Sequence, residues 1–444
     1  MKKNFSLNLH IDVYENDPNL ILPLQLVLKY CKEDLEINGS EVEFSILNND
    51  FITNNSNFFN KTNLLFENKQ LPKYDYAILN PPYYKLNISN PQSKSMNEII
   101  SGQPNLYTLF IAMSASLIKT NGQLVFITPR SFCSGLYYEK FRKWFLRNLE
   151  MTNIHIFESR KENFDNDDVL QENIIVKVEK NNPNNKNNLV DFSVSKNKNF
   201  DTIEKFRVLY SDIVFKNNSN VFIRIPTTQK DISILHKVDS WKSSLAQLGL
   251  DISTGPVIPF RAKDFLVREV NENSVPLLWM HNIKEMKVNY PEFKKNKPAA
   301  VCVSSSSMPI LLPIKNYVLV KRFSAKEQKR RLDSAVLISK EFSYKFIGIE
   351  NHINYIHKLN GELSINEAFG IASILNSKLI DIYFRALNGN TQVNATDIRN
   401  LPFPLIEDVK EIGRTSYDFF SKNERIECDN IIRNVLDIKE ISAI

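Results

Sequence analysis

Apolar runs alternate with helix-like stretches through the first half of the chain. Residues 5–14 alternate apolar and polar positions like a strand, residues 19–34 have helical spacing, and residues 42–47 are again strand-like. A third β-favouring run, 76–79, stops at residues 80–83, Asn-Pro-Pro-Tyr, because two consecutive prolines cannot donate to a sheet. This order predicts a parallel α/β sheet, and the loops at the carboxyl ends of such strands usually hold the ligand.

The same alternation continues to about residue 180 and then changes. From about residue 221 it predicts strands mixed with longer helices, among them a helix over 231–248 that Gly249 ends, and another over 363–385. We therefore predict two domains, 1–225 and 226–444. The first-half elements that the pattern predicts are helices over 105–118 and 137–149 and strands over 123–129, 153–158 and 174–178.

The Asn-Pro-Pro-Tyr stretch has a composition that suits a planar amine. Asn80 offers a carboxamide oxygen as an acceptor. The Pro81 carbonyl is a second acceptor, and Pro82 cannot hydrogen-bond to it because proline has no N–H. Two acceptors held side by side by a rigid Pro-Pro turn match an exocyclic amine with two hydrogens, and Tyr83 adds a flat face for stacking. The alternative is an Asx-type turn with a surface tyrosine.

These residues resemble the catalytic motif of TaqI-like, gamma-class N6-adenine DNA methyltransferases of restriction-modification systems. The resemblance implies that Asn80 and the Pro81 carbonyl hold the amine of a flipped-out adenine, that Pro82 stiffens the turn, and that Tyr83 stacks on the base. It also implies that Phe164, an isolated aromatic in a polar segment, packs edge-on against the base, the alternative being a loop anchor. Residues 85–103, polar and rich in Asn and Ser, predict a mobile loop over this site.

The resemblance implies S-adenosylmethionine (SAM) as the cofactor. Glu15, at the carboxyl end of the first predicted strand, matches the acid that holds the ribose, and Asp50 and Phe51 match the pair that binds the cofactor's adenine. Asn80 borders both cofactor and base. An alternative for the residues after Glu15 is a helix start, with Asp17 as the N-cap and Pro18 in the first turn.

One part of the family pattern is missing. SAM-dependent enzymes of this kind need a glycine-rich turn after their first strand, and no such turn precedes Glu15 in a chain with only 11 glycines. We therefore expect a Rossmann-like methyltransferase domain whose first strand is missing, followed by an α+β target-recognition domain. Either a second polypeptide supplies the strand and the glycine-rich loop, or the chain is an inactive DNA-binding or specificity subunit, or a truncated remnant.

The second half carries no catalytic pattern but has a basic cluster. Strand-like residues lead into a set of cationic side chains. The pattern predicts a surface that contacts DNA phosphates and guanine edges. The alternative is a solvated helix face. Residues 389–404 resemble the closing motif of target-recognition domains. The predicted DNA-binding residues are Lys321, Arg322, Lys326, Lys329, Arg330 and Arg331.

Composition narrows the remaining possibilities. A net charge of +6 permits a double-stranded DNA partner without demanding one, and a cognate restriction endonuclease is expected as a partner. A fusion-derived restriction enzyme is the other alternative, although we find no nuclease motif with a strand around it. No apolar run approaches the ~18–20 residues that span a bilayer, and no signal peptide is present, which predicts a cytoplasmic protein. The 4 cysteines are too scattered for a metal site or a disulfide framework.

Overall fold

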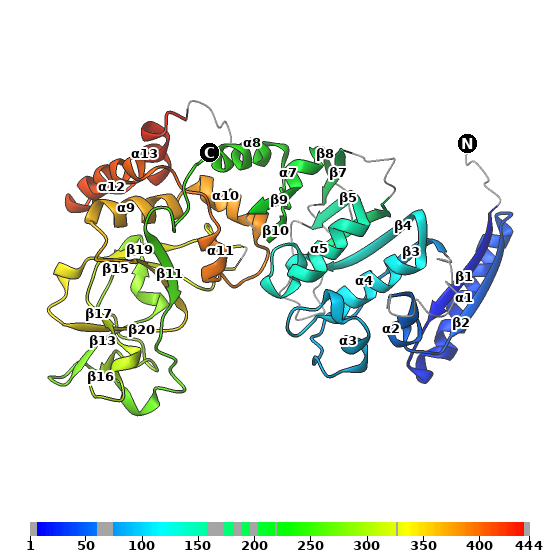
Figure 1. Cartoon of the computed structure of the whole chain (residues 1–444), viewed down its shortest axis with the longest axis horizontal. Coiled ribbons are helices and arrows are strands. Elements are labelled where there is room, and N and C mark those ends of the chain that lie inside the picture. The colour runs from blue at the N-terminus through cyan, green and yellow to red at the C-terminus, as the bar shows by residue number, and fades with distance from the viewer. Residues whose placement is uncertain are drawn as a thin grey trace. The chain divides into compact units, whose positions relative to one another are not determined.

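The structure is a computed structural model that describes residues 7–59, 74–157, 172–181, 188–195, 203–217, 220–325 and 327–438. The chain divides into two compact units, Met1–His155 with Asn173–Val190, and Ile156–Glu172 with Asp191–Ile444. Helices and strands are mixed in both units (Figure 1). The boundary predicted at residue 225 remains a prediction about where the target-recognition domain begins.

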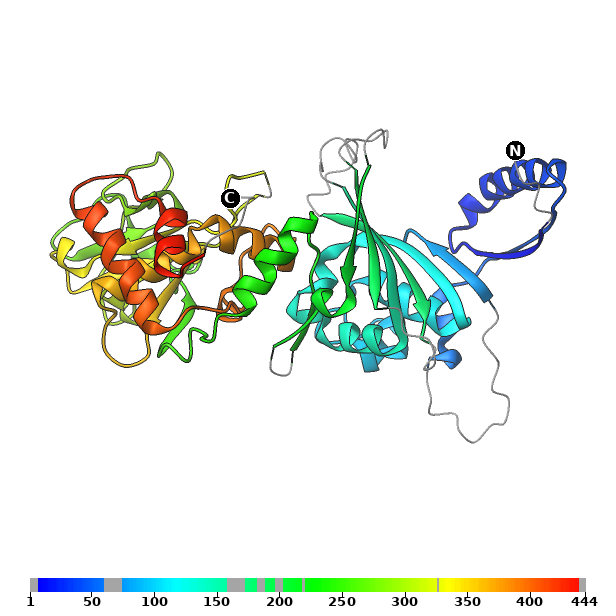
Figure 2. The ribbon, with the colours of Figure 1, turned by 90° about the horizontal axis from the view of Figure 1, so that it is seen from above.

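The first unit opens with a β–α–β segment. β1 (Asn8–Tyr14) and β2 (Glu41–Leu47) are parallel and pair over their whole length, and α1 (Pro18–Ile37) connects them. All three elements confirm the sequence prediction. Within the described residues the two strands form a sheet of their own, which Figures 1 and 2 show beside the larger sheet of this unit.

The larger sheet of the first unit is built from the remaining predicted elements. These are β3 (Tyr74–Leu79), α4 (Leu106–Leu117), β4 (Ile118–Pro129), α5 (Glu139–Asn148), β5 (Leu149–Phe157) and β6 (Asn173–Lys180). The strand order is β3-β4-β6-β5, with β3 parallel to β4 and β4 antiparallel to β6. The α/β character that the sequence predicts is confirmed.

An aromatic cluster holds the helices against one face of this sheet. Phe126 of β4 is fully buried, and its ring lies 6.2 Å from that of Phe145 on α5 and 6.3 Å from that of Phe132. Phe141 of α5 in turn packs against Phe132 at 5.9 Å. Each buried ring contributes about 1.5–3 kcal/mol, so this face of the sheet is firmly covered.

The segment between β3 and α4 is more ordered than the sequence predicts. It forms α3 (Pro91–Ser95), which Asn90 caps by accepting from the amide of Gln92. Met96 and Ile99, directly after α3, are buried. The polar loop predicted over 85–103 thus contains a short capped helix and two buried apolar side chains that anchor it to the unit. Its mobility stays a prediction.

The second unit begins with short strands and helices and then forms two sheets. Its first elements are β7 (Leu189–Ser195), β8 (Ile203–Leu209), α7 (Tyr210–Ile213), β9 (Val214–Asn217), β10 (Asn220–Ile223) and α8 (Gln229–Asp239). The strands of the two sheets are β11 (Leu250–Thr254), β12 (Leu266–Val267), β13 (Ser274–Leu278), β14 (Ile283–Lys284), β15 (Met286–Val288), β16 (Ala300–Cys302), β17 (Leu312–Pro313), β18 (Tyr317–Lys321), β19 (Ser334–Leu337), β20 (Phe346–Ile349) and β21 (Ile353–Lys358). One sheet has the order β11-β21-β18-β19-β15-β14 and the other β12-β16-β13-β20-β17.

Helices complete the second unit at its carboxyl end. They are α9 (Ile365–Leu375), α10 (Lys378–Leu387), α11 (Ala395–Arg399), α12 (Ile406–Ser421) and α13 (Cys428–Val435). α9 and α12 approach closely at Gly370 and Gly413, where a Cβ would lie 1.9 Å from the Val409 carbonyl oxygen and 1.7 Å from that of Asn366. A side chain at either glycine would force the two helices apart.

Two helix predictions in this unit were wrong in extent. The helix predicted over 231–248 ends at Asp239, because the backbone of Ser243 pairs in both directions with that of Phe403, at 2.8 and 3.0 Å. The single helix predicted over 363–385 is two helices, since Ser377 caps α10 by accepting from the amide of Ile380. In both places a tertiary or capping hydrogen bond overrides the helical pattern.

None of the helices that the structure describes is long and apolar enough to cross a membrane.

Candidate active site

The Asn-Pro-Pro-Tyr loop lies at the carboxyl end of β3, as predicted. β3 ends at Leu79, Asn80 and Pro82 are exposed, and Pro81 between them is buried. The buried proline fixes the loop, and the Asn80 side chain is accessible from outside. The sequence-predicted arrangement of a carboxamide next to a rigid turn is therefore present.

The hydroxyl of Tyr83 joins this loop to the neighbouring strand. It lies 2.9 Å from Oδ1 of Asn80 and 3.0 Å from the main-chain carbonyl oxygen of Ile127 on β4. Burial raises the pKa of Tyr83 to about 12, so the phenol keeps its proton at neutral pH. A phenol has one proton to donate, and so it can satisfy only one of these two acceptors at a time.

α4 provides a common support for the two predicted parts of the site. The ring of Tyr107 meets that of Tyr83 edge to face at 6.2 Å, and the ring of Phe110 stacks on that of Phe51 at 5.3 Å. Tyr107 and Phe110 lie three residues apart, which places them on one face of the helix. The Asn-Pro-Pro-Tyr loop and the predicted cofactor residue Phe51 are therefore positioned by the same helix.

Glu15 follows β1 as predicted, and Asp17 has a separate role. The Glu15 side chain is half-buried and accepts a hydrogen bond from the amide of Asp17 at 2.7 Å. Asp17 caps α1 by accepting from the amide of Asn19 at 2.9 Å, and Pro18 occupies the first turn. The helix-start alternative for Asp17 is confirmed, and it holds the backbone after Glu15 in place.

Asp50 accepts hydrogen bonds from its own helix and from Gln92, a residue that the sequence pattern did not single out. It caps α2 (Phe51–Asn54), where Oδ1 accepts from both the amide and the hydroxyl of Thr53 at 2.7 Å. Its Oδ2 accepts from the side-chain amide of Gln92 on α3. The Asn90-Pro91 pair, a cap followed by a helix-starting proline, is the signal that could have placed Gln92 on a helix facing the site.

The predicted cofactor residues lie near one another. Tyr14, which precedes Glu15, meets the ring of Phe51 edge to face at 4.9 Å. Phe51 follows Asp50 directly. Glu15 at the end of β1 and Asp50 after β2 therefore lie at the same edge of this two-stranded parallel sheet. Phe164, predicted from the sequence to pack against the base, lies outside the described residues.

The structure separates the basic cluster of the second unit into different environments. Lys321 is paired with Asp333, and Arg322 donates to the Asn351 carbonyl at 3.0 Å. Lys329 is exposed and Arg330 is half-buried. Lys326 lies outside the described residues. Lys329 is thus the member of the cluster whose placement best suits contact with DNA.

Arg331 is an interior residue. It is 1% exposed, and its guanidinium donates to the hydroxyl of Ser324 and to the main-chain carbonyls of Asn388 and Asn390. Its backbone amide donates to Asp381. These contacts hold the start of the 389–404 segment, so we leave Arg331 out of the proposed DNA-contacting set.

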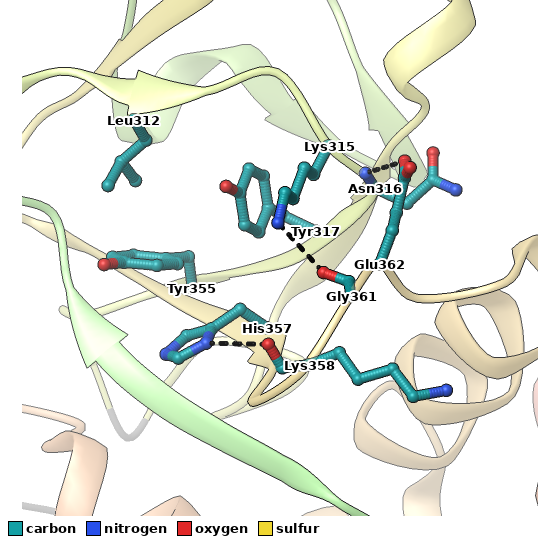
Figure 3. A pocket seen from close by; sticks show the side chains of 9 residues that line it. All are labelled: Leu312, Lys315, Asn316, Tyr317, Tyr355, His357, Lys358, Gly361 and Glu362. Atoms are coloured by element: carbon teal, nitrogen blue, oxygen red, sulfur yellow. Dashed lines mark hydrogen bonds between the residues drawn. The ribbon is translucent and has the colours of Figure 1, made fainter.

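A cavity of about 150 Å³ lies in the second unit (Figure 3). The rings of Tyr317 and Tyr355 line it, and they meet edge to face at 5.5 Å. Lys315 donates to the Gly361 carbonyl at 3.0 Å, and Glu362 accepts from the amide of Asn316 at 2.7 Å. None of the predicted site residues lines the cavity, and these polar groups are bonded to the protein itself.

Comparison with known proteins decides the family. Residues 5–164 match the Eco57I restriction-modification methylase family. The chain is 37% identical to the type II methyltransferase M.PstI of Providencia stuartii over 428 residues, which is 96% of this chain and 82% of M.PstI. It belongs to the type II restriction-modification methyltransferases. M.BsuBI of Bacillus subtilis, another type II methyltransferase, is 34% identical over 96% of this chain and 83% of its own length.

Likeness to solved structures is weaker. The type IIG restriction endonuclease BpuSI aligns with 89% of this methyltransferase and 51% of its own chain, at 13% identity and a TM-score of 0.36. The matches to relatives therefore carry the assignment, and they confirm the resemblance that the sequence predicts. The family match at residues 5–164 contains Glu15, Asp50 and Asn80.

Removing the Tyr83 hydroxyl should loosen Asn80. Tyr83→Phe leaves the Ile127 carbonyl without its phenol donor, so we expect the free energy of unfolding to fall by about 1 kcal/mol in urea titrations. Methyl transfer should fall by roughly tenfold, the equivalent of one such hydrogen bond. Tyr84→Phe, at an exposed neighbouring tyrosine, is the control and should leave both quantities unchanged. Equal effects of the two variants would contradict a positioning role for the Tyr83 hydroxyl.

Arg331 and Lys329 should differ in what they stabilise. Arg331→Ala removes three side-chain hydrogen bonds from a buried site and should lower the free energy of unfolding by about 3 kcal/mol. Lys329→Ala should leave stability unchanged, weaken DNA binding, and reduce the salt dependence of that binding by about one counterion. Urea titration and fluorescence anisotropy at several salt concentrations measure these effects. Unchanged stability of Arg331→Ala would contradict its interior role.

Proposed function

We propose that this chain is the larger part of a SAM-dependent DNA adenine N6-methyltransferase, acting on an adenine flipped out of the duplex. The observation that carries the proposal is the accessible Asn80 side chain on a proline-fixed turn, beside a tyrosine anchored to β4. The family assignment supports methyl transfer within a restriction-modification system. A separate cognate endonuclease is the expected partner.

Asn80 and Pro81 bind the target amine in this proposal. Oδ1 of Asn80 and the Pro81 carbonyl accept its two hydrogens, which turns the nitrogen lone pair out of the base plane and away from the ring. When Tyr83 donates to Ile127, the Asn80 carboxamide can turn so that its NH₂ group donates to the phenol oxygen. Asn80 Oδ1 then faces the base, while the Tyr83 ring stacks on it.

Glu15, Asp50 and Phe51 are the residues that would hold SAM, which supplies an electrophilic methyl group on sulfur. Asp50 accepts three hydrogen bonds from the protein, and a carboxylate has about four lone-pair sites, so one remains for an amine of the cofactor. Glu15 accepts one bond from the protein and keeps acceptor sites for a pair of ribose hydroxyls. The side chains present therefore fit the cofactor's nucleoside end.

The chain's contribution to the reaction is positioning. SAM held by Glu15, Asp50 and Phe51 would supply its methyl group to the amine nitrogen that Asn80 and Pro81 orient, and the nitrogen would then release a proton to solvent. No side-chain base is required before attack, because the lone pair is already available once Asn80 and Pro81 have fixed the amine. Holding the reactants in line supplies most of the rate, and excluding water supplies part of the rest.

Recognition of DNA is assigned to the second unit. Flipping a base out of the duplex costs a few kcal/mol, which contacts to the phosphates must offset. Exposed Lys329, with Arg330 beside it, is the part of the predicted basic cluster that we retain for this role, together with Lys321 and Arg322 at the end of β18. Lys326 and Phe164 keep their proposed roles, toward phosphate and toward base, from the sequence alone.

Asn80→Ala should abolish methyl transfer while keeping SAM binding. We expect at least a roughly hundredfold loss of transfer, because the amine is no longer oriented, and a SAM dissociation constant within about twofold of the parent value. Calorimetry with SAM and transfer of a radiolabelled methyl group to DNA measure the two quantities. Both are measured on the 444-residue chain alone and with any polypeptide encoded immediately upstream.

Asn87→Ala is the matched control, since Asn87 is exposed in the same segment and bonds only locally to Ser89 in the described structure. It should retain full transfer. Parent-level transfer by Asn80→Ala would contradict the proposed base-binding role. Absence of SAM binding in both preparations would instead favour a DNA-binding subunit without transfer activity.

A further inference from the structure

The loop that follows β4 lies at the same edge of the sheet as the Asn-Pro-Pro-Tyr loop. β3 and β4 are parallel neighbours, with Leu79 paired to Phe126, so their carboxyl ends lie at one edge (Figure 1). Residues 130–138 connect the end of β4 to α5 through two short 3-10 turns, Arg130–Cys133 and Leu136–Tyr138. Ligands of open α/β sheets bind at this edge, so the loop is placed to contact the substrate.

The tip of this loop exposes two large side chains. Leu136 is 58% exposed and Tyr137 is 61% exposed, whereas Phe132 and Cys133, earlier in the loop, are buried. The ring of Tyr137 lies against Gly102, where a Cβ would come within 3.0 Å of it. The loop thus has a buried base and an exposed, largely apolar tip, and the tip contacts the segment that precedes α4.

A buried cation holds this loop in shape. Arg142 of α5 is 2% exposed, and its guanidinium donates to the main-chain carbonyls of Phe132 at 2.8 Å and Gly135 at 3.0 Å. Burial lowers the pKa of Arg142 to about 10, so the guanidinium stays charged at neutral pH, and charge-assisted hydrogen bonds are stronger than neutral ones. Gly135 has no room for a side chain, because a Cβ would lie 2.8 Å from the Ser131 carbonyl oxygen. The tip is therefore presented by a rigid loop.

Aromatic rings connect the tip to the Asn-Pro-Pro-Tyr loop. Tyr138, the last residue of the second turn, stacks on Tyr107 at 5.9 Å, and Tyr107 meets Tyr83 edge to face at 6.2 Å. The Ser131 hydroxyl lies 2.9 Å from that of Tyr107 and adds a second link to the same side chain. These separations keep the ring of Tyr138 within about 12 Å of that of Tyr83, or roughly four base-pair steps at ~3.4 Å each. The loop tip and the Tyr83 ring therefore lie within reach of the same few base pairs.

Exposed lysines follow both loops in the chain. Lys140 comes directly after the second loop, at the start of α5, and Lys85 comes two residues after Tyr83; both are exposed. Glu139, which precedes Lys140, is paired with Lys143, and 2.6 Å separates Oε1 from Nζ. An apolar tip with lysines near it suits a partner that surrounds an apolar stack with phosphates, and duplex DNA has this composition.

We infer that Leu136 and Tyr137 form a wedge that enters the duplex beside the base bound by Asn80, and that Leu136 fills the gap which this base leaves in the stack. Proteins that kink DNA insert leucine and similar apolar side chains between base steps. Such a wedge stabilises the opened duplex and offsets part of the cost of flipping the base. The inference rests on the proposed function, because it takes the base bound by Asn80 to be flipped out.

Binding to DNA with a preformed gap tests the wedge. Two duplexes of the same mixed sequence are compared by fluorescence anisotropy, one intact and one with a single abasic site, where no base has to leave the stack. A side chain that fills a gap gains contacts only where the gap exists. We therefore expect the 444-residue chain to bind the abasic duplex at least roughly tenfold more tightly, and Leu136→Ala to reduce this preference to about threefold or less. Equal binding of the two duplexes by the parent chain would overturn the inference.

Leu359→Ala is the matched control, because Leu359 is 57% exposed and belongs to the second unit. It should keep the full preference for the abasic duplex, and urea titrations should show that neither variant is destabilised, since both leucines are exposed. An unchanged preference in Leu136→Ala would overturn the inference and leave a protein partner as the occupant of the loop tip. Methyl transfer is measured in parallel. Transfer by a parent chain that has no preference would contradict this inference alone, whereas a preference that depends on Leu136 without any transfer would count against the proposed function and leave the wedge standing.

Discussion

The Tyr83 hydroxyl has one proton and two oxygens within reach, and the chemistry available to Asn80 depends on which oxygen receives it. The Ile127 carbonyl belongs to the end of β4, a strand held by pairing on both sides. Anchoring the phenol there fixes the plane of its ring against Tyr107 and fixes one end of the Asn80 carboxamide. A loop of four residues thereby acquires the rigidity of the sheet, which a site that works by positioning requires.

α4 extends this constraint to the cofactor side. Because Tyr107 and Phe110 lie one turn apart, movement of the helix would move the supports of Tyr83 and Phe51 together. Gln92 and Asp50 add a second connection, from α3 to the start of α2. The first unit is thus firm around the proposed base and cofactor residues.

The sequence predicted the first unit better than the second, for physical reasons. Proline stops, the Asp17-Pro18 helix start and clean apolar periodicity are local signals, and they placed β1 to β6 and the Asn80 loop. Arg331 was misjudged because burial of a guanidinium depends on partners such as the Asn388 carbonyl, 57 residues away. Likewise Ser243 leaves the helical pattern to pair with Phe403, and Gln92 reaches Asp50 across 42 residues. No pattern within a short window contains these distant partners.

The identity of the methylated nucleoside tests the account most directly. DNA incubated with SAM and the 444-residue chain, with and without any polypeptide encoded immediately upstream, would be digested to nucleosides and analysed by mass spectrometry. The geometry at Asn80 predicts N6-methyladenine, and predicts that Asn80→Ala abolishes it. Methylation of cytosine, or N6-methyladenine at the same level with Asn80→Ala, would contradict the role assigned to the end of β3.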